Sequence, residues 1–348
     1  MWGGGTYVSQ NKTLPGAYIN FFAVDKVSAV LGERGTVAIA LPLNFKAGSV
    51  IEITRAEFVN NSVELLGKDM VDESLIMLRE IFQNASKCYI YDLGTTHTAF
   101  DAILALEQYE FNVLCVYTDE AEDITQYIIA VKSWRDEAGK KCQAVVYNQN
   151  KPDHEGIINV TTSVERGEDS EIPAYALVAW VAGVEAGCEV NKSCMNRLYN
   201  GEYEVVTNKS QTELETAINN GEFVFHKVYG EVRVLKDINS LTTTTLEKSD
   251  DFKSNQVIRV IDLIGNDTAK LFNKKYLGQI PNDVEGRTSF WADIVAHRKE
   301  LEKIRAIHNY KSDELIVEEG KTKESVVVYE LVEVTTAMGK LYMTIYVG

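Results

Sequence analysis

The stretch from Lys87 to Tyr117, "KCYIYDLGTTHTAFDAILALEQYEFNVLCVY", decides the fold class of this chain. Its two ends, "KCYIYDL" and "NVLCVY", are short apolar runs of the kind that form buried strands. The segment "TAFDAILALEQ" between them predicts a helix. A strand, a helix and a strand in this order are typical of a parallel or mixed sheet that helices cover on both faces.

The same alternation continues on both sides of this stretch. Before it, residues 73–85 predict a helix whose apolar stripe contains Leu75, Leu78, Ile81 and Phe82. After it, the sequence predicts a helix at 123–139, strands at 142–147 and 156–160, an apolar helix at 174–187 and a hairpin at 221–235 that turns at Gly230. We therefore expect an α/β middle domain at residues 71–245.

The regions that flank the middle domain have a different character. Residues 27–70 contain short runs interrupted by turn residues, which predicts a small module resembling a β-barrel or β-sandwich. Residues 246–335 predict an α+β C-terminal domain. Its expected elements are a strand at 256–264, a helix at 266–278, a long amphipathic helix at 287–307 with Thr288 or Ser289 as its N-cap, and strands within 324–348.

Both ends of the sequence predict strands that have no obvious hairpin partner. At residues 1–26, the glycines Gly3–Gly5 precede a strand-like segment with the apolar residues Tyr18, Ile19, Phe21 and Phe22. At residues 336–348, the segment "KLYMTIYVG" alternates strictly and places Leu341, Met343, Ile345 and Val347 on one face. We interpret these segments as linking arms, because an unpaired apolar strand tends to pair with another chain. The expected fold class is thus an α/β and α+β multidomain chain with two extended terminal arms.

Composition excludes several classes of function. The 348 residues are enough for two or three domains, and a net charge of −16 disfavours direct binding to nucleic acid. The five cysteines include no CxxC pair, which favours a reducing compartment. The first residues do not resemble a signal peptide, and the longest apolar run, Ala174–Val184, is too short to span a bilayer. We expect a chain made in the cytoplasm that does not insert into membranes.

The sequence contains no recognisable catalytic constellation. Neither GxGxxG nor GxxxxGK[ST] occurs, so we expect no dinucleotide or P-loop site. The turn at 92–101 carries Asp92, His97 and Asp101, which allows either a metal or acid/base site or simple helix capping by Thr96 or Thr98. We favour capping.

The remaining candidate groups also favour structural roles. Cys188 and Cys194 lack a nearby histidine, so we interpret them as loop thiols and not as zinc ligands. We assign His297 and His308 to a solvated helix face. No catalytic residue, cofactor or metal is predicted.

Three segments resemble the contractile tail sheath proteins of phages and phage-tail-like bacteriocins, most closely the short Gram-positive type. They are "GGTYVSQNKTLPGAYINF" (4–21), "GEVRVLKDINSLTT" (230–243) and "IRVIDLIGNDTAKLFNKKYLGQIPNDVEGRTSFWADIV" (258–295). The resemblance covers nearly the whole chain, which lacks the large insertions of longer phage sheaths.

The resemblance implies a structural protein and not an enzyme. Sheath subunits form six-fold rings stacked helically around an inner tube, and contraction drives that tube through a bacterial envelope. Each subunit's two arms add strands to a neighbour's C-terminal-domain sheet. The implied partners are other copies of the chain, the inner tube protein, and baseplate and terminator or collar proteins. Such a sheath is assembled in the bacterial cytoplasm and belongs to a phage tail or a released tailocin.

For the inner-tube contact we predict charged residues on two helical segments of the C-terminal domain. These residues are Lys270, Lys274, Lys275, Arg298, Lys299 and Glu302. A solvated helix face is the competing interpretation of the same residues. The alternative functions are a small-ligand α/β enzyme with a site at the 92–101 turn, and a tail tube or baseplate protein.

Overall fold

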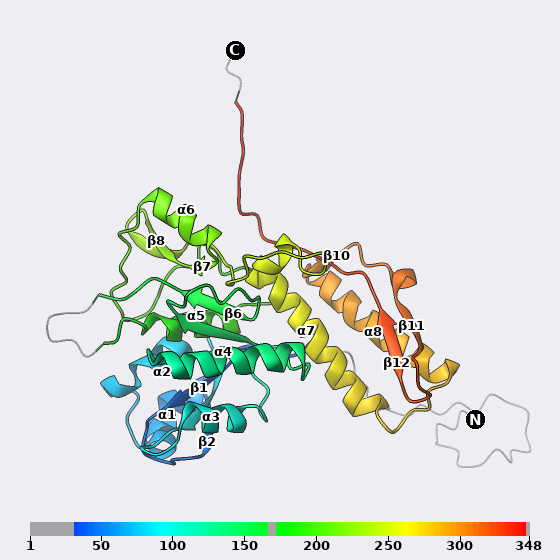
Figure 1. Cartoon of the computed structure of the whole chain (residues 1–348), viewed down its shortest axis with the longest axis horizontal. Helices are drawn as coiled ribbons and strands as arrows, with labels where there is room; N and C mark the ends of the chain where they lie inside the picture. The colour runs from blue at the N-terminus through cyan, green and yellow to red at the C-terminus, as the bar shows by residue number, and fades with distance from the viewer. Residues whose placement is uncertain (1–30, 166–171, 346–348) are drawn as a thin grey trace, which may run out of the picture.

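The computed structural model describes residues 31–165 and 172–345 (Figure 1). The whole of the predicted N-terminal arm, residues 1–26, therefore lies outside the described residues. The predicted linking residues that fall outside them are Tyr18, Ile19, Phe21, Phe22 and Val347.

A seven-stranded sheet forms the centre of the larger part of the molecule, in the order β2-β3-β1-β4-β5-β6-β7. All neighbouring strands are parallel except β2 and β3, which pair antiparallel. The strands are β1 (Thr36–Leu41), β2 (Val50–Thr54), β3 (Lys87–Asp92), β4 (Val113–Cys115), β5 (Gln143–Tyr147), β6 (Ile157–Val160) and β7 (Glu222–Phe223). The predicted α/β fold class is confirmed, and the sheet also includes β1 and β2, which lie before the predicted bounds of the middle domain, 71–245.

Helices cover both faces of this sheet. Because side chains of a strand alternate between its two faces, each strand contributes to two cores. Val37 and Ile39 of β1 belong to the core under α2 and α5, whereas Ala38 and Ala40 belong to the core under α3 and α4. These helices are α2 (Ile76–Phe82), α3 (Ala99–Leu106), α4 (Ala121–Asp136) and α5 (Leu177–Gly187).

The separate β module predicted at 27–70 is wrong. Its two strands, β1 and β2, belong to the central sheet, and residues Arg55–Leu66 form helix α1. Thr54 and Glu57 form a capping box at the start of α1, so the local sequence does specify a helix there. The partners of β1 lie about 50 and 75 residues further along the chain; local patterns do not reveal such distant pairing.

The predicted hairpin that turns at Gly230 is present. It consists of β8 (Phe225–Val228) and β9 (Glu231–Val234), and it lies near α6 (Gln211–Asn219) (Figure 1). Tyr229 and Gly230 both have positive φ, which suits a two-residue hairpin turn.

The C-terminal part is built on two long helices and two small sheets. The helices are α7 (Asn255–Leu271), which continues into a π-helical turn (Phe272–Tyr276), and α8 (Val284–Lys303). The strands are β10 (Ile307–His308), β11 (Ile316–Glu319), β12 (Val326–Tyr329) and β13 (Glu333–Val334), paired as β10 with β13 and β11 with β12.

Two predictions for this part are wrong in detail. Residues 256–264 form the first half of α7 and not a strand, because one side of the helix packs on the middle domain and the other on the C-terminal core. Six of the nine residues are apolar and most of those are β-branched, which favours a strand, but Arg259 and Asp262 recur at helical spacing. Helix α8 begins earlier than predicted, with Asp283 as its N-cap in place of Thr288 or Ser289.

Helix α7 connects the two parts of the molecule through a polar stripe (Figure 1). Asn255, Arg259, Asp262 and Asn266 lie on one side of the helix and bond to the middle domain. Asp262 receives two hydrogen bonds from Arg135, of 2.6 and 2.8 Å. Directional contacts of this kind fix the orientation of one part relative to the other.

The strand predicted near the C-terminus is not formed within the chain. Residues 335–345 contain no strand, and the end of this stretch extends away from the body (Figure 1). The physical reason is that a strand needs a hydrogen-bonded neighbour, and this segment has none within the described residues.

Candidate assembly interface

The antiparallel pair β11–β12 has two open edges. Ile316 pairs with Tyr329 and Glu319 with Val326, and among the described residues no third strand joins either side. Val317, Val326 and Val328 pack toward the core of the C-terminal part. Unpaired backbone groups on an edge strand accept a further strand readily.

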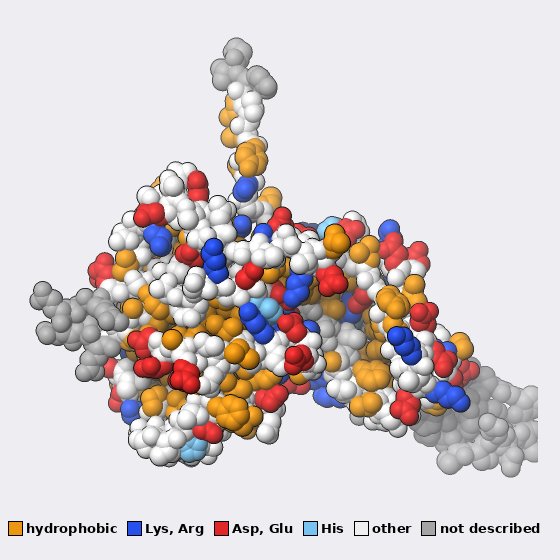
Figure 2. Space-filling view, in the orientation of Figure 1, with side chains coloured by type: hydrophobic (Ala, Val, Ile, Leu, Met, Phe, Trp, Pro, Cys, Tyr) orange, Lys and Arg blue, Asp and Glu red, His pale blue; other side chains and the backbone are white. Residues whose placement is uncertain are grey.

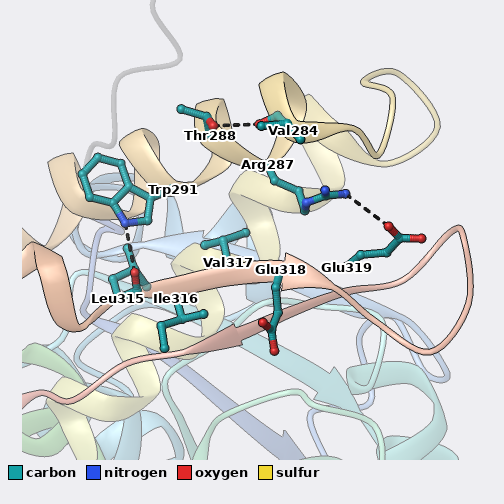
Figure 3. Close-up of a pocket in the computed structure, with 9 residues that line it drawn as sticks. All are labelled: Val284, Arg287, Thr288, Trp291, Leu315, Ile316, Val317, Glu318 and Glu319. Atoms are coloured by element: carbon teal, nitrogen blue, oxygen red, sulfur yellow. Dashed lines mark hydrogen bonds and ion pairs between the residues drawn. The ribbon is translucent and has the colours of Figure 1, made fainter.

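A groove of about 460 Å³ runs along β11 (Figure 3). One wall is β11 and the other is the first half of α8, where Arg287 and Trp291 point toward the strand. The indole Nε1 of Trp291 donates a hydrogen bond of 3.1 Å to the carbonyl oxygen of Leu315, which fixes the start of β11 on the helix. At the other end, Arg287 lies 3.9 Å from a carboxylate oxygen of Glu319.

A second groove of about 460 Å³ lies between α7 and β12. Its apolar lining includes Ile264, Ala269, Val326 and Val328. The two grooves thus border the two strands of the same small sheet. The sequence alone did not reveal them, because each groove combines residues of a helix and a strand that are far apart in the chain.

The C-terminal stretch has the properties of a strand that could enter such a groove. Leu341, Met343 and Ile345 are 85%, 70% and 69% exposed, although they are apolar. Figure 2 shows hydrophobic side chains along this stretch, standing clear of the rest of the molecule. Exposed alternating apolar residues of this kind indicate a segment that is buried against a partner.

The residues predicted for the inner-tube contact do not form one surface. Arg298 is buried and makes a two-pronged ion pair with Glu330, so it does not offer its charge to a partner in this conformation. Lys275 bonds to Asp293 at 2.6 Å, and Lys270 lies 3.4 Å from Glu110. Glu302 accepts a backbone hydrogen bond from Tyr310, whereas Lys274 and Lys299 are exposed.

The turn at 92–101 is used for loop and helix contacts. The Asp92 carboxylate accepts four backbone N–H bonds of 2.7–3.0 Å, from Asn44, Phe45, Lys46 and Gly94. Burial acts to raise its pKa, but these donors hold the pKa of Asp92 below its usual value. The loop after β1 consequently covers the position where open α/β sheets usually bind ligands.

The capping interpretation of this turn is confirmed. Thr98 is the N-cap of α3, and Asp101 completes a capping box with it. Asp101 accepts hydrogen bonds from the backbone N–H and the hydroxyl of Thr98, at 2.8 and 2.9 Å. His97 lies beside Thr96, with 3.2 Å between its Nδ1 and the threonine hydroxyl.

Two clusters bring metal-binding residue types together among the described residues. In the first, His154 faces Asp136 and Glu155, but its Nδ1 accepts a hydrogen bond from the Gly156 N–H. The neutral ring therefore carries its proton on Nε2, the atom that a metal would need. In the second, Arg259 occupies the space between Glu185 and Asp237. Neither arrangement suits a metal ion.

The five cysteines are free thiols. Cys194 is buried and belongs to the second cluster. A hydrogen bond from Cys194 together with nearby arginines lowers the pKa of the Cys188 thiol to about 7. Of the two predicted surface histidines, His308 is exposed but His297 is buried against Asp267. Within the described residues, no helix has the length and apolarity needed to cross a membrane.

Comparison with known families gives two matches on this chain. Residues 94–240 match the phage tail sheath protein central domain, and residues 247–348 match the phage tail sheath C-terminal domain. Together they cover well over half of the sequence.

Curated relatives agree with these matches. The phage-like element PBSX protein XkdK of Bacillus subtilis is 30% identical over 258 residues, which is 71% of this chain and 55% of that protein. A tail sheath protein of Clostridium phage phiCD119 is 28% identical over 221 residues, or 64% of this chain and 61% of that one. The chain therefore spans between about half and two thirds of the length of these relatives.

Solved structures show the same fold. The sheath tail protein of Desulfitobacterium hafniense superimposes with a TM-score of 0.79 at 23% identity, covering 92% of this chain and 96% of that one. The helical sheath of the anti-feeding prophage, solved in its contracted state, gives a TM-score of 0.71 at 17% identity, covering 97% and 99%. The fold that contains β11, β12 and the two long helices is thus one that solved sheath proteins also have.

Proposed function

Because the chain belongs to the phage tail sheath family, we propose that it is the structural subunit of a contractile sheath. In this proposal, copies of the chain assemble into six-fold rings that stack helically around an inner tube. One observation carries the proposal. Within residues 31–165 and 172–345, the chain offers a small sheet with two open, grooved edges and an exposed apolar stretch that pairs with no strand.

Strand addition explains how such subunits would hold together. A strand that enters an edge gains backbone hydrogen bonds, and its alternate side chains fill the groove. Burying one apolar side chain contributes about 1.5–3 kcal/mol, whereas ordering the backbone costs about 1–2 kcal/mol per residue. A single arm is therefore only marginally stable in its groove, and two arms per subunit are needed for a strong connection.

The work of contraction would come from energy stored at assembly. No nucleotide-binding motif occurs in the sequence, so the proposed energy source is a less stable extended lattice that relaxes into a contracted one. Lys274 and Lys299 are exposed and remain candidates for the inner-tube contact, together with Lys270 and Lys275 if their ion pairs open. Arg298 is no longer a candidate in this conformation.

Assembly in the bacterial cytoplasm, followed by incorporation into a phage tail or a tailocin, remains part of the proposal. So do contacts with baseplate and terminator or collar proteins. The solved anti-feeding prophage baseplate contains a chain that superimposes on this one with a TM-score of 0.72. This similarity of fold supports the proposed contact with a baseplate.

Electron microscopy of the purified chain tests the proposal. We expect hollow tubes or stacked six-fold rings from the full chain. Deletion of residues 341–348 removes the apolar stretch but no part of either core, so this variant should stay folded and fail to form tubes. Deletion of residues 1–20 should do the same.

Circular dichroism and thermal unfolding of each deletion variant provide the control for folding. A full chain that remains monomeric at high concentration would contradict the proposal as a whole. Tubes formed by either truncated chain would contradict the role of that arm.

A further inference from the structure

One buried side chain of α7 holds Thr335 and Ala337, which lie just before the exposed C-terminal stretch. The Gln256 side chain is 3% exposed, and both ends of its amide are used. Its Nε2 donates to the Thr335 carbonyl oxygen at 3.1 Å, and its Oε1 accepts from the Ala337 N–H at 3.0 Å. The next residue, Met338, is 99% exposed. Gly339 passes beside Met195, and the free stretch follows it.

The first described residues of the chain are held by the same helix. The Gly32 N–H donates to Asp267 Oδ2 at 2.9 Å. A methyl group at Gly32 would lie 2.5 Å from Asp267 Oδ1, so only glycine allows the chain to approach the helix this closely.

Asp267 is itself fixed by a chain of hydrogen bonds that reaches the end of β12. Arg298 donates to Nδ1 of His297 at 2.8 Å, which leaves the ring proton on Nε2. His297 Nε2 then lies 2.8 Å from Asp267 Oδ2 and donates to it. On its other side, Arg298 donates to Glu330, which follows β12. The carboxylate that holds Gly32 therefore has little freedom to move.

We propose that α7 acts as a bracket that positions both terminal arms, with Gln256 and Asp267 as its two positioning residues. These residues are eleven positions apart on one continuous helix, which corresponds to about 16 Å along its axis. The distance between the two points at which the arms leave the subunit would then be set by a rigid element. This inference rests on the proposed function, since positioning has a consequence only if the arms link subunits.

Two pairs of substitutions test the bracket, one member on α7 and one on the chain that it holds. Gln256→Met keeps the length of the side chain but removes both hydrogen bonds, and Ala337→Pro removes the N–H that Gln256 accepts. At the other end, Asp267→Asn weakens the acceptor, and Gly32→Ala forces the backbone away from it. The substitutions at Gly32 and Ala337 leave the helix itself unchanged.

Hydrogen exchange of the full-length, unassembled chain gives the first measurement. Gln256→Met should speed exchange of the Ala337 amide about fivefold while leaving the Gly32 amide unchanged, because a net hydrogen bond contributes about 1 kcal/mol. Asp267→Asn should speed exchange of the Gly32 amide and leave exchange of the Ala337 amide unchanged. The exposed neighbours supply matched controls, since Glu33→Ala and Met338→Ala touch neither contact.

Assembly gives the second measurement. All four bracket variants should reduce the sedimentable, tubular fraction at least tenfold relative to wild type and to the two control variants. Normal tubes with unchanged helical rise and twist from both Gln256→Met and Ala337→Pro would overturn the inference, as would unchanged amide exchange. If the wild-type chain forms no tubes, the proposed function fails, while the exchange experiment still decides whether α7 holds the two segments.

Discussion

Buried charged groups are the residues on which stability depends most directly. Glu80 on α2 is fully buried, and it accepts hydrogen bonds from the Glu202 N–H and from the Tyr199 hydroxyl at 2.9 Å. Burial raises the pKa of Glu80 to about 7 from the ordinary value of 4.5. The loop that contains Glu202 is thus attached to the middle domain through an acid that prefers to be protonated.

Glu80 should make the stability of the chain depend on pH. Because its pKa is higher in the folded state, its contribution is fully present below about pH 4.5 and is lost as the pH rises to about 7. Relative to Glu80→Gln, the wild-type free energy of unfolding should fall by about 3 kcal/mol across that range. Urea unfolding of both proteins at several pH values measures this difference. Parallel curves would show that Glu80 does not titrate in this way.

Arg259 should be essential for the contact between the two parts of the molecule. Its guanidinium bonds to Glu185 and Asp237, and all three side chains are buried. Burial holds the pKa of Glu185 well above its usual value, whereas the pKa of Asp237 is lowered. Arg259→Met would leave the buried Asp237 carboxylate without its cation, so we expect a loss of about 3–5 kcal/mol in the free energy of unfolding. Adding Glu185→Gln and Asp237→Asn should restore much of that loss. A single variant as stable as wild type would contradict this account.

Among the elements, those that depend on local sequence were the predictable ones. The strands and helix of 87–117 follow from apolar runs and a capped turn, and the structure contains all three. The pairing of β1 with β3 and β4 could not be predicted, because no local pattern names a partner so distant in the chain. For 256–264 the error came from the high proportion of β-branched residues, although Arg259 and Asp262 recur at helical spacing and belong to the polar face of α7.

The candidate interface could be predicted only in part. The alternation of Leu341, Met343 and Ile345 predicted a strand, and among the described residues these side chains are exposed and belong to no strand. The two grooves could not be predicted, because they form where α7 and α8 meet β11 and β12. The same limit explains why the prediction for Arg298 failed. Its charge suggested that it lies on the surface, but the fold buries it beside Glu330.

Filling either groove should prevent assembly without disturbing the fold. Thr288 on α8 and Ala269 on α7 are exposed and line the first and second groove, respectively. Thr288→Arg or Ala269→Arg should change stability by less than about 0.5 kcal/mol and should abolish tubes in electron micrographs.

Ala296→Arg is the matched control, since Ala296 is exposed on α8 and lines neither groove. It should assemble like wild type. Tubes of normal appearance from both groove variants would show that these grooves do not receive strands.

At the scale of the whole molecule, charge should influence how fast subunits associate. Each copy carries a net charge of −16, so copies repel one another over a distance set by the ionic strength. That distance is about 30 Å at 0.01 M salt and about 8 Å at 0.15 M. We expect tubes to form faster at the higher salt concentration, as measured by light scattering. Slower assembly in salt would indicate that attraction between opposite charges controls the encounter.

If the C-terminal stretch links subunits as proposed, it would also give the cell a way to distinguish unused subunits from assembled ones. Proteases bind extended, accessible backbone, and residues 338–345 present such backbone with Lys340 at a site where trypsin-like enzymes cleave. In an assembled sheath, a neighbouring subunit would shield the same bonds. Surplus or misassembled copies would then be trimmed and could no longer join a growing tail, so turnover would remove defective subunits before they entered the particle.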